Sequence, residues 1–170
     1  NFCDTSGNLL FYSNGSKVFN FEHKLIEGAD SLNYSKYWTL NNKQGVFGNY
    51  LIGSYPYSMI AFRSPSNNNQ YYLVSTIMNY DSLAQTKWLQ FHKVSYSIID
   101  MSLNNGRGKM IVKEKTLLHG LFSHAIAACK HANGRDWWIS AREYKTNCYY
   151  YFKLDTGGIR YDHKQCIGLP

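Results

Sequence analysis

The chain has 170 residues, the length of one ordinary domain, and its 18 basic and 11 acidic residues give a formal net charge of +7. Aromatic residues make up 16% of it, which is typical of β-rich proteins, and only 3 Pro and 13 Gly exclude collagen-like or low-complexity sequence. The basic residues are scattered, so they predict a cationic surface, with acidic glycans, anionic cell surfaces or nucleic acid as alternative partners. No apolar run approaches the roughly 18 residues of a membrane span.

Turns rich in Asn, Gly and Ser divide the chain into short apolar or aromatic runs, which predicts strands joined by tight turns. The predicted strands cover residues 9–13, 16–20, 58–64, 71–78, 88–101, 109–118, 125–130, 137–142 and 148–154. Asn14-Gly15 and Asn133-Gly134 are hairpin signals, because a type I′ turn needs positive φ at both central residues. Residues 22–55 show no persistent period, and residues 117–128, the one helix candidate, fit a loop followed by a strand better.

A weak internal repeat relates residues 61–75 to residues 126–140 without gaps. In this alignment of the two segments, Asn68 corresponds to Asn133 and Val74 corresponds to Ile139. Each unit reads as strand, polar turn, strand, loop, strand, Gly turn and strand, which is the pattern of a propeller blade. We therefore expect an all-β fold of four-stranded antiparallel meanders in series, a partial β-propeller. As a single domain or fragment, it would hold part of a blade in residues 1–27, a blade in residues 56–118 and another in residues 121–167.

The four cysteines show neither CxxC nor metal-ligand spacing, and they allow three pairings. Cys129 and Cys148 fall on the outer strands of one predicted meander, about 9–10 Å apart at normal strand spacing. That distance is too long for a disulfide, so we interpret both as free, buried thiols. The chain does not open with Met, and we expect a processed chain or a fragment.

The candidate catalytic groups are carboxylates that lack an evident partner. Asp155-Thr156-Gly157 contains the Asp-Thr-Gly of aspartic proteases, but that chemistry needs two such carboxylates and the chain has one copy. A glycine-rich turn at the end of a strand explains the same letters. A glycan hydrolase would instead need a pair of carboxylates in one pocket. The acidic residues considered for such a pair are Asp81, Asp100, Asp136, Glu143 and Asp155.

No metal, phosphate or cofactor site is predicted. The six histidines show neither HxH nor HExxH spacing, and His119 and His124 would meet only through folding. Residues 106–109 lack the remaining letters of a phosphate-binding loop. Trp137-Trp138 and residues 149–152 are aromatic clusters, for which we favour core packing over stacking on sugar rings or bases.

Three segments resemble a family of large secreted surface proteins from gliding-type bacteria. Residues 7–15, GNLLFYSNG, are similar to that family's GNLLFYSNG signature. Residues 96–108, YSIIDMSLNNGRG, resemble its YSVVDMSLNGGLG segment, and residues 130–139, KHANGRDWWI, its KHANGxDYWVI segment. The three occur in the family's order and span nearly the whole chain.

The resemblance implies the propeller-like N-terminal region of a modular protein that continues into immunoglobulin-like (PKD) repeats and a C-terminal sorting domain. It supplies no catalytic residues. We therefore expect a non-catalytic binding or adhesion module of an exported, secreted or cell-surface protein, with a protein or glycan ligand and no assigned binding residues. The alternatives are a glycan-active hydrolase and a purely structural spacer. Nucleic acid is not expected as a partner, because no nucleic-acid-binding motif is present, and self-association is expected if the chain is a fragment.

Overall fold

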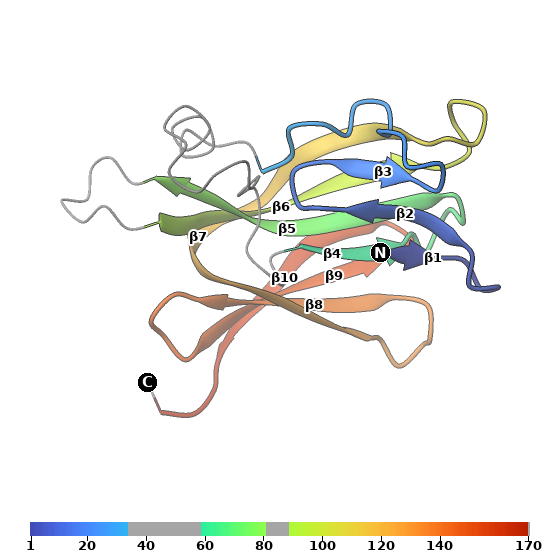
Figure 1. The fold of residues 1–170 in the computed structure, drawn as a ribbon. Helices are drawn as coiled ribbons and strands as arrows, with labels where there is room; N and C mark the ends of the chain where they lie inside the picture. The colour runs from blue at the N-terminus through green and yellow to red at the C-terminus, as the bar shows by residue number, and fades with distance from the viewer. Residues whose placement is uncertain (34–58, 81–88, 170) are drawn as a thin grey trace.

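The computed structural model describes residues 1–33, 59–80 and 89–169, and within these ranges the chain is all-β, as predicted. The strands form a three-stranded sheet and a seven-stranded sheet, both antiparallel (Figure 1). They are β1 (Phe2–Cys3), β2 (Leu9–Ser13), β3 (Val18–Asn20), β4 (Met59–Arg63), β5 (Gln70–Tyr80), β6 (Leu89–Asp100), β7 (Lys109–Lys130), β8 (Trp137–Glu143), β9 (Cys148–Asp155) and β10 (Gly158–Cys166). The described residues contain no helix that would cross a membrane.

The large sheet is a meander in which each strand pairs with its neighbours in the sequence, in the order β10-β9-β8-β7-β6-β5-β4. The strands predicted at 58–64, 71–78, 88–101, 137–142 and 148–154 lie in it within a few residues of their expected ends, whereas 109–118 and 125–130 merge into one strand, β7. The expected starts at residues 58 and 88 lie outside the described residues. Short polar turns suffice for this topology because antiparallel neighbours need no crossover.

The hairpins at Asn14-Gly15 and Asn133-Gly134 are confirmed, but the type I′ geometry was wrong. Only the glycines have positive φ, 88° and 69°, whereas neither asparagine does. The asparagine side chains close these turns instead. Asn133 Oδ1 accepts hydrogen bonds from the backbone N–H groups of Arg135 (3.1 Å) and Asp136 (3.0 Å). An asparagine can thus mimic a backbone turn without leaving the usual φ region.

Strand β7 joins the two halves of the large sheet, β4–β6 and β8–β10. It continues for 22 residues, pairing with β6 and then with β8. The loop expected before residue 125 was therefore wrong, because residues 117–124 belong to this strand. The blade boundary expected between residues 118 and 121 also falls inside β7. The units 56–118 and 121–167 thus contribute to a single sheet, and the described strands close into neither a barrel nor a propeller.

The sheet curls so that its two halves pack face to face. Phe62 on β4 contacts Trp137 on β8, with ring centroids 5.1 Å apart, although three strands separate β4 from β8 in the sheet. Between the halves lies a core that includes Val74, Phe122 and Phe152. Phe152 has no exposed surface, and burying such a side chain stabilises the fold by roughly 1.5–3 kcal/mol. This curl brings β4 and β8, which are distant in the sheet, into contact.

The small sheet β1–β3 covers the other face of β5 and β6 (Figure 1). Phe11 on β2 packs edge-on against Tyr71 on β5, with centroids 5.3 Å apart. Alternate side chains of β5 therefore enter two cores, Tyr71 and Leu73 on one face and Tyr72 and Val74 on the other. Residues 1–27, expected to be part of a blade, thus supply a separate three-stranded layer.

Candidate functional site

A cavity of about 430 Å³ opens where β7 bends between β6 and β8. Its walls are largely aromatic and apolar, and they carry a few polar groups. The lining residues used below are Phe91, Phe122, His124, Arg142, Tyr144 and Tyr149. A concave apolar site of this size with a few polar groups has the features of a small-ligand or sugar-ring site.

The cavity exists because β7 bulges at this point. Phe122 pairs with Glu143 and Ile126 pairs with Ala141, so four steps along β7 match two along β8. The extra residues bend the strand, and Thr76 Oγ1 on β5 donates a hydrogen bond of 2.9 Å to the carbonyl oxygen of His124. Bulges often re-aim side chains beside functional sites. Here the bulge leaves Arg142, between Ala141 and Glu143 on β8, without a register partner on β7.

Buried and exposed aromatic residues form different parts of the cavity. Phe122, 1% exposed, packs edge-on against Tyr150 with centroids 5.4 Å apart and belongs to the core. Tyr144 lies just past β8 and remains 44% exposed, held by a 2.9 Å hydrogen bond from its N–H to the carbonyl oxygen of Leu121. Tyr149 on β9 is half-buried. From the sequence, core packing was favoured for the aromatic cluster 149–152. In the structure, the side chains of β9 alternate between the two faces of the sheet, so Phe152 lies in the core and Tyr149 lies at the cavity.

Polar side chains continue from the cavity along one face of β8 and β9. Arg142 is opposite Tyr149 and Ser140 is opposite Tyr151. The Tyr151 ring stacks on His163 of β10, with centroids 4.7 Å apart. This open sheet face therefore combines aromatic rings with hydrogen-bonding groups, next to the cavity.

Arg142 is positioned by the turn after β8. Its Nε donates a 2.9 Å hydrogen bond to the carbonyl oxygen of Thr146. Its terminal nitrogens have no hydrogen-bond partner among the described residues. None of the described residues that line the cavity is Asp or Glu. The described part of the lining is therefore complementary to a neutral or anionic ligand.

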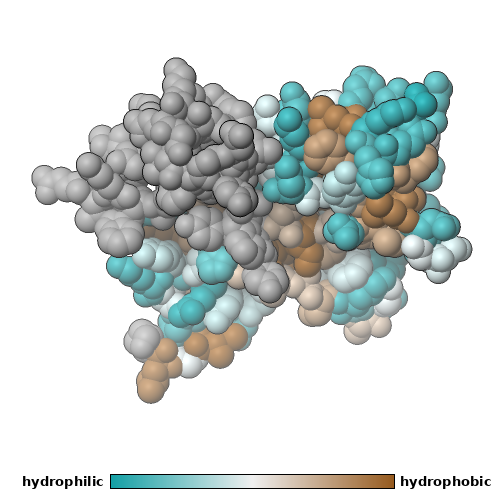
Figure 2. Space-filling view, in the orientation of Figure 1, coloured by the Kyte–Doolittle hydropathy of each residue, from teal (hydrophilic) through white to brown (hydrophobic). Residues whose placement is uncertain are grey.

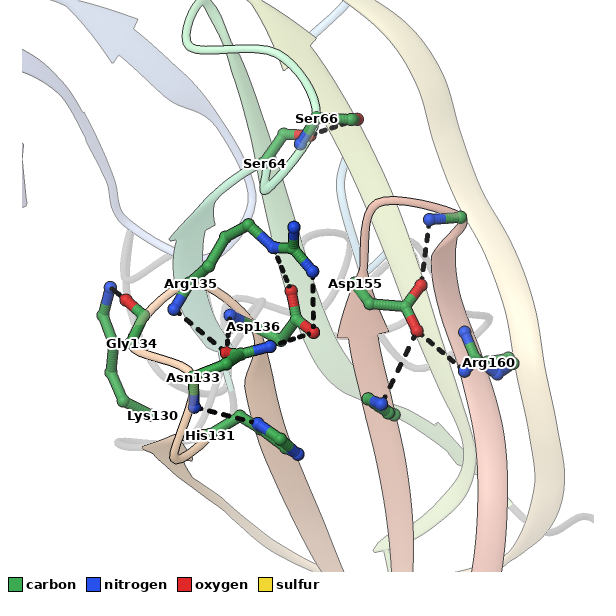
Figure 3. A network of polar contacts seen from close by, with 12 residues as sticks. Ser64, Ser66, Lys130, His131, Asn133, Gly134, Arg135, Asp136, Asp155 and Arg160 are labelled. Carbon is green, nitrogen blue, oxygen red and sulfur yellow. Dashed lines mark hydrogen bonds and ion pairs between the residues drawn. The ribbon is translucent and has the colours of Figure 1, made fainter.

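Asp136, one of the catalytic candidates, is instead the centre of a turn network (Figure 3). Its carboxylate accepts hydrogen bonds from Arg135 Nε at 2.8 Å and from Asn133 Nδ2 at 2.7 Å. These hydrogen bonds lower the pKa of Asp136 to about 2, and the bond from Arg135 contributes most. An ionised carboxylate held in this way stabilises the β7–β8 turn.

Asp155 similarly ends a strand, which supports the interpretation of Asp-Thr-Gly as a turn. Thr156 and Gly157 connect β9 to β10, and the Gly157 N–H donates to Asp155 Oδ1 at 2.9 Å. The other carboxylate oxygen lies 2.7 Å from Arg160 and 3.8 Å from Lys153 (Figure 3). The hydrogen bond from Arg160 is the main reason that the pKa of Asp155 is lowered.

The two other described carboxylates considered for catalysis are also kept ionised by hydrogen-bond donors. Ser102 and Gln70 donate to Asp100, and its pKa is lowered, chiefly by Ser102. Glu143 accepts hydrogen bonds from Tyr150 at 2.7 Å and Lys164 at 3.0 Å, and its pKa is also lowered, chiefly by Tyr150. A catalytic general acid needs the opposite shift.

None of these four described carboxylates lines the cavity. The fifth candidate, Asp81, lies outside the described residues.

The histidines are dispersed over the described strands. No group of three or more His, Cys, Asp or Glu side chains there is arranged to hold a metal ion. His92 occupies an irregularity between β6 and β7, and burial is the main cause of its lowered pKa. His124 contacts the Phe91 ring at the cavity, with centroids 6.2 Å apart, while His163 stacks on Tyr151. His119 pairs with Lys93 on β6, whereas His124 lies within the bulge of β7.

The cysteine interpretation was wrong for Cys148, which forms a disulfide with Cys166. These residues lie directly opposite one another on β9 and β10. Cys129 is free, as expected, but it is exposed rather than buried, and so is Cys3. Just beyond Cys166 the chain exposes Ile167 and Leu169, and Figure 2 shows hydrophobic residues at this end of the molecule.

Comparison of the chain with known families, characterised proteins and solved structures finds no match.

Proposed function

We propose that this protein is a non-catalytic binding module whose ligand is a carbohydrate, held in the cavity and along the adjoining face of β8 and β9. The observation that carries the proposal is the cavity of about 430 Å³ with Tyr144 and Tyr149 in its lining. Sugar rings have apolar faces that stack on aromatic side chains and hydroxyl groups that need hydrogen-bond partners. Ser140 and Arg142 supply such partners beside the tyrosines.

A glycan-active hydrolase is the competing proposal. It needs a proton donor and a second carboxylate on either side of one sugar bond. The described carboxylates support it poorly, because Asp100, Asp136, Glu143 and Asp155 are held ionised by neighbouring donors. A purely structural spacer is supported less than a binding module, because a spacer needs no lined cavity.

The cellular context is a further part of the proposal. The likeness of residues 7–15, 96–108 and 130–139 to surface proteins of gliding-type bacteria supports an exported protein with an adhesive role. The disulfide between Cys148 and Cys166 agrees with it, because such bonds persist in oxidising compartments. A propeller remains a proposal, because the described strands of the large sheet form one meander that does not close on itself.

The test is a glycan array followed by calorimetric titration of the best ligand against two matched variants. Tyr144→Ala removes an exposed ring at the cavity, whereas Tyr161→Ala removes a ring of similar exposure, 42%, outside its lining. Loss of one stacking ring costs about 1 kcal/mol, so Tyr144→Ala should weaken binding roughly fivefold. Tyr161→Ala should leave the affinity unchanged.

Other outcomes would overturn the proposal. Equal losses in the two variants would move the binding site away from the cavity, and an empty glycan array would remove carbohydrate as the ligand. Release of new reducing ends from any bound glycan, abolished by replacing a single carboxylate, would establish the hydrolase instead.

A further inference from the structure

We infer that the sugar bound in the cavity carries a carboxylate, as in a uronate-containing polysaccharide, and that Arg142 pairs with it. This inference rests on the proposed function and adds the chemical class of the ligand. It comes from the unequal pairing of charges over the C-terminal half of the sheet.

Three cations on this half of the sheet have acidic partners in the protein, whereas Lys130 and Lys145 lie over the rings of Trp137 and Tyr144. Arg135 pairs with Asp136 at 2.8 Å, and Arg160 pairs with Asp155 at 2.7 Å. Lys164 lies 3.0 Å from Glu143. These charges are largely compensated, so they attract an external anion weakly.

Arg142 differs from the three paired cations because no described acidic residue pairs with it, and it lines the cavity. The bond from its Nε to Thr146 orients the side chain while leaving the two terminal nitrogens for another acceptor. A guanidinium group binds a planar carboxylate through two parallel hydrogen bonds. Such a site is set up to receive an anion from outside the protein.

The neighbours of Arg142 select a sugar acid over a simple anion. Tyr149 is the register partner of Arg142 on β9, and both line the cavity. A uronate presents an apolar ring face and a carboxylate on the same ring, so Tyr149 and Arg142 can contact one residue together. The formal net charge of +7 also favours the approach of a polyanion.

The experiment compares tetrasaccharides of galacturonate and of mannuronate, each as the acid and as the methyl ester, by calorimetric titration. The ester keeps the ring faces and removes the charge. The acid of the preferred sugar should bind at least about tenfold more tightly than its ester, as expected for hydrogen bonds to a charged group. Arg142→Gln should abolish that difference, so that the acid and the ester bind this variant with equal affinity.

The matched control is Arg107→Gln, which removes the same charge from an arginine paired with Glu22 at 3.1 Å, outside the cavity lining. It should preserve the preference for the acid. Because Arg142→Gln also removes the bond to Thr146, measurable ester binding by this variant shows that the cavity is still formed.

The results separate this inference from the proposed function. Binding of acid and ester with equal affinity, or equal losses in the two arginine variants, would refute a carboxylate at Arg142 while leaving a carbohydrate-binding module. Binding of neutral glycans alone would do the same. Tighter, Arg142-dependent binding of decanoate or of a peptide C-terminus would refute a sugar acid and a carbohydrate module together, as would an absence of binding to any glycan.

Discussion

The disulfide between Cys148 and Cys166 should contribute substantially to stability. It joins the outermost strand, β10, to β9 and closes a loop with a sequence separation of 18 residues. For a loop of that length, restriction of the unfolded chain is worth about 3 kcal/mol. The β9–β10 hydrogen bonds remain when the bond is removed, so the folded state should lose little else. We therefore expect Cys148→Ala/Cys166→Ala to lower the free energy of unfolding by about 3 kcal/mol.

Urea unfolding followed by tryptophan fluorescence measures this change. With a slope of about 2 kcal/mol per molar urea, the midpoint should fall by roughly 1.5 M. A reducing agent should shift the wild-type protein by a similar amount and leave the double variant unchanged. Cys129→Ala is the control, because Cys129 is a free, exposed thiol, and it should move the midpoint little. A double variant as stable as the wild type would refute the reasoning.

Two further perturbations test the turns that organise the sheet. Gly108 and Gly106 both have positive φ, 87° and 79°, but a Cβ at Gly108 would lie 2.8 Å from Met101 Sδ, whereas one at Gly106 would meet nothing within 4 Å. Gly106→Ala should therefore cost about 1–2 kcal/mol from backbone strain alone in urea unfolding. Gly108→Ala should cost about 1 kcal/mol more, because the flexible end of Met101 must also move aside; equal costs would contradict the packing around this turn. The pKa of Asp136 is lowered from 3.8 to about 2, mainly by its bond from Arg135, so its stabilising effect should be full above about pH 4 and disappear as the pH falls toward 2. Asp136→Asn should flatten that part of the curve of unfolding free energy against pH, and an unchanged pH profile would argue against the network.

The sequence by itself determined the local structure of this protein. Asn, Gly and Ser mark most of the turns, because each closes a turn through positive φ or through a side-chain bond to the backbone. Between the turns, aromatic and β-branched residues favour strands. Asp155-Thr156-Gly157 was correctly assigned to a turn on the same local grounds.

The cysteine pairing shows how a small tertiary detail escapes such reasoning. A regular hairpin around Thr156 and Gly157 would place Gln165 opposite Cys148. The register instead shifts by one residue between Tyr161 and His163, which brings Cys166 opposite Cys148. The glycine turn after Asp155 indicates that β9 and β10 pair as a hairpin. The bulge that brings the two cysteines into register, however, has no recognisable pattern in the sequence.

Only the tertiary structure decided how the two halves of the sheet meet and where the cavity lies. A repeat can show that two segments resemble each other, but it cannot show that they share β7 as one continuous strand. The contact of Phe62 with Trp137 and the bulge of β7 before Ile126 depend on the twist accumulated over the whole sheet. Arg142 and Tyr149 therefore come together at the cavity through long-range packing, because strand alternation specifies the face of a side chain but not what lies above that face.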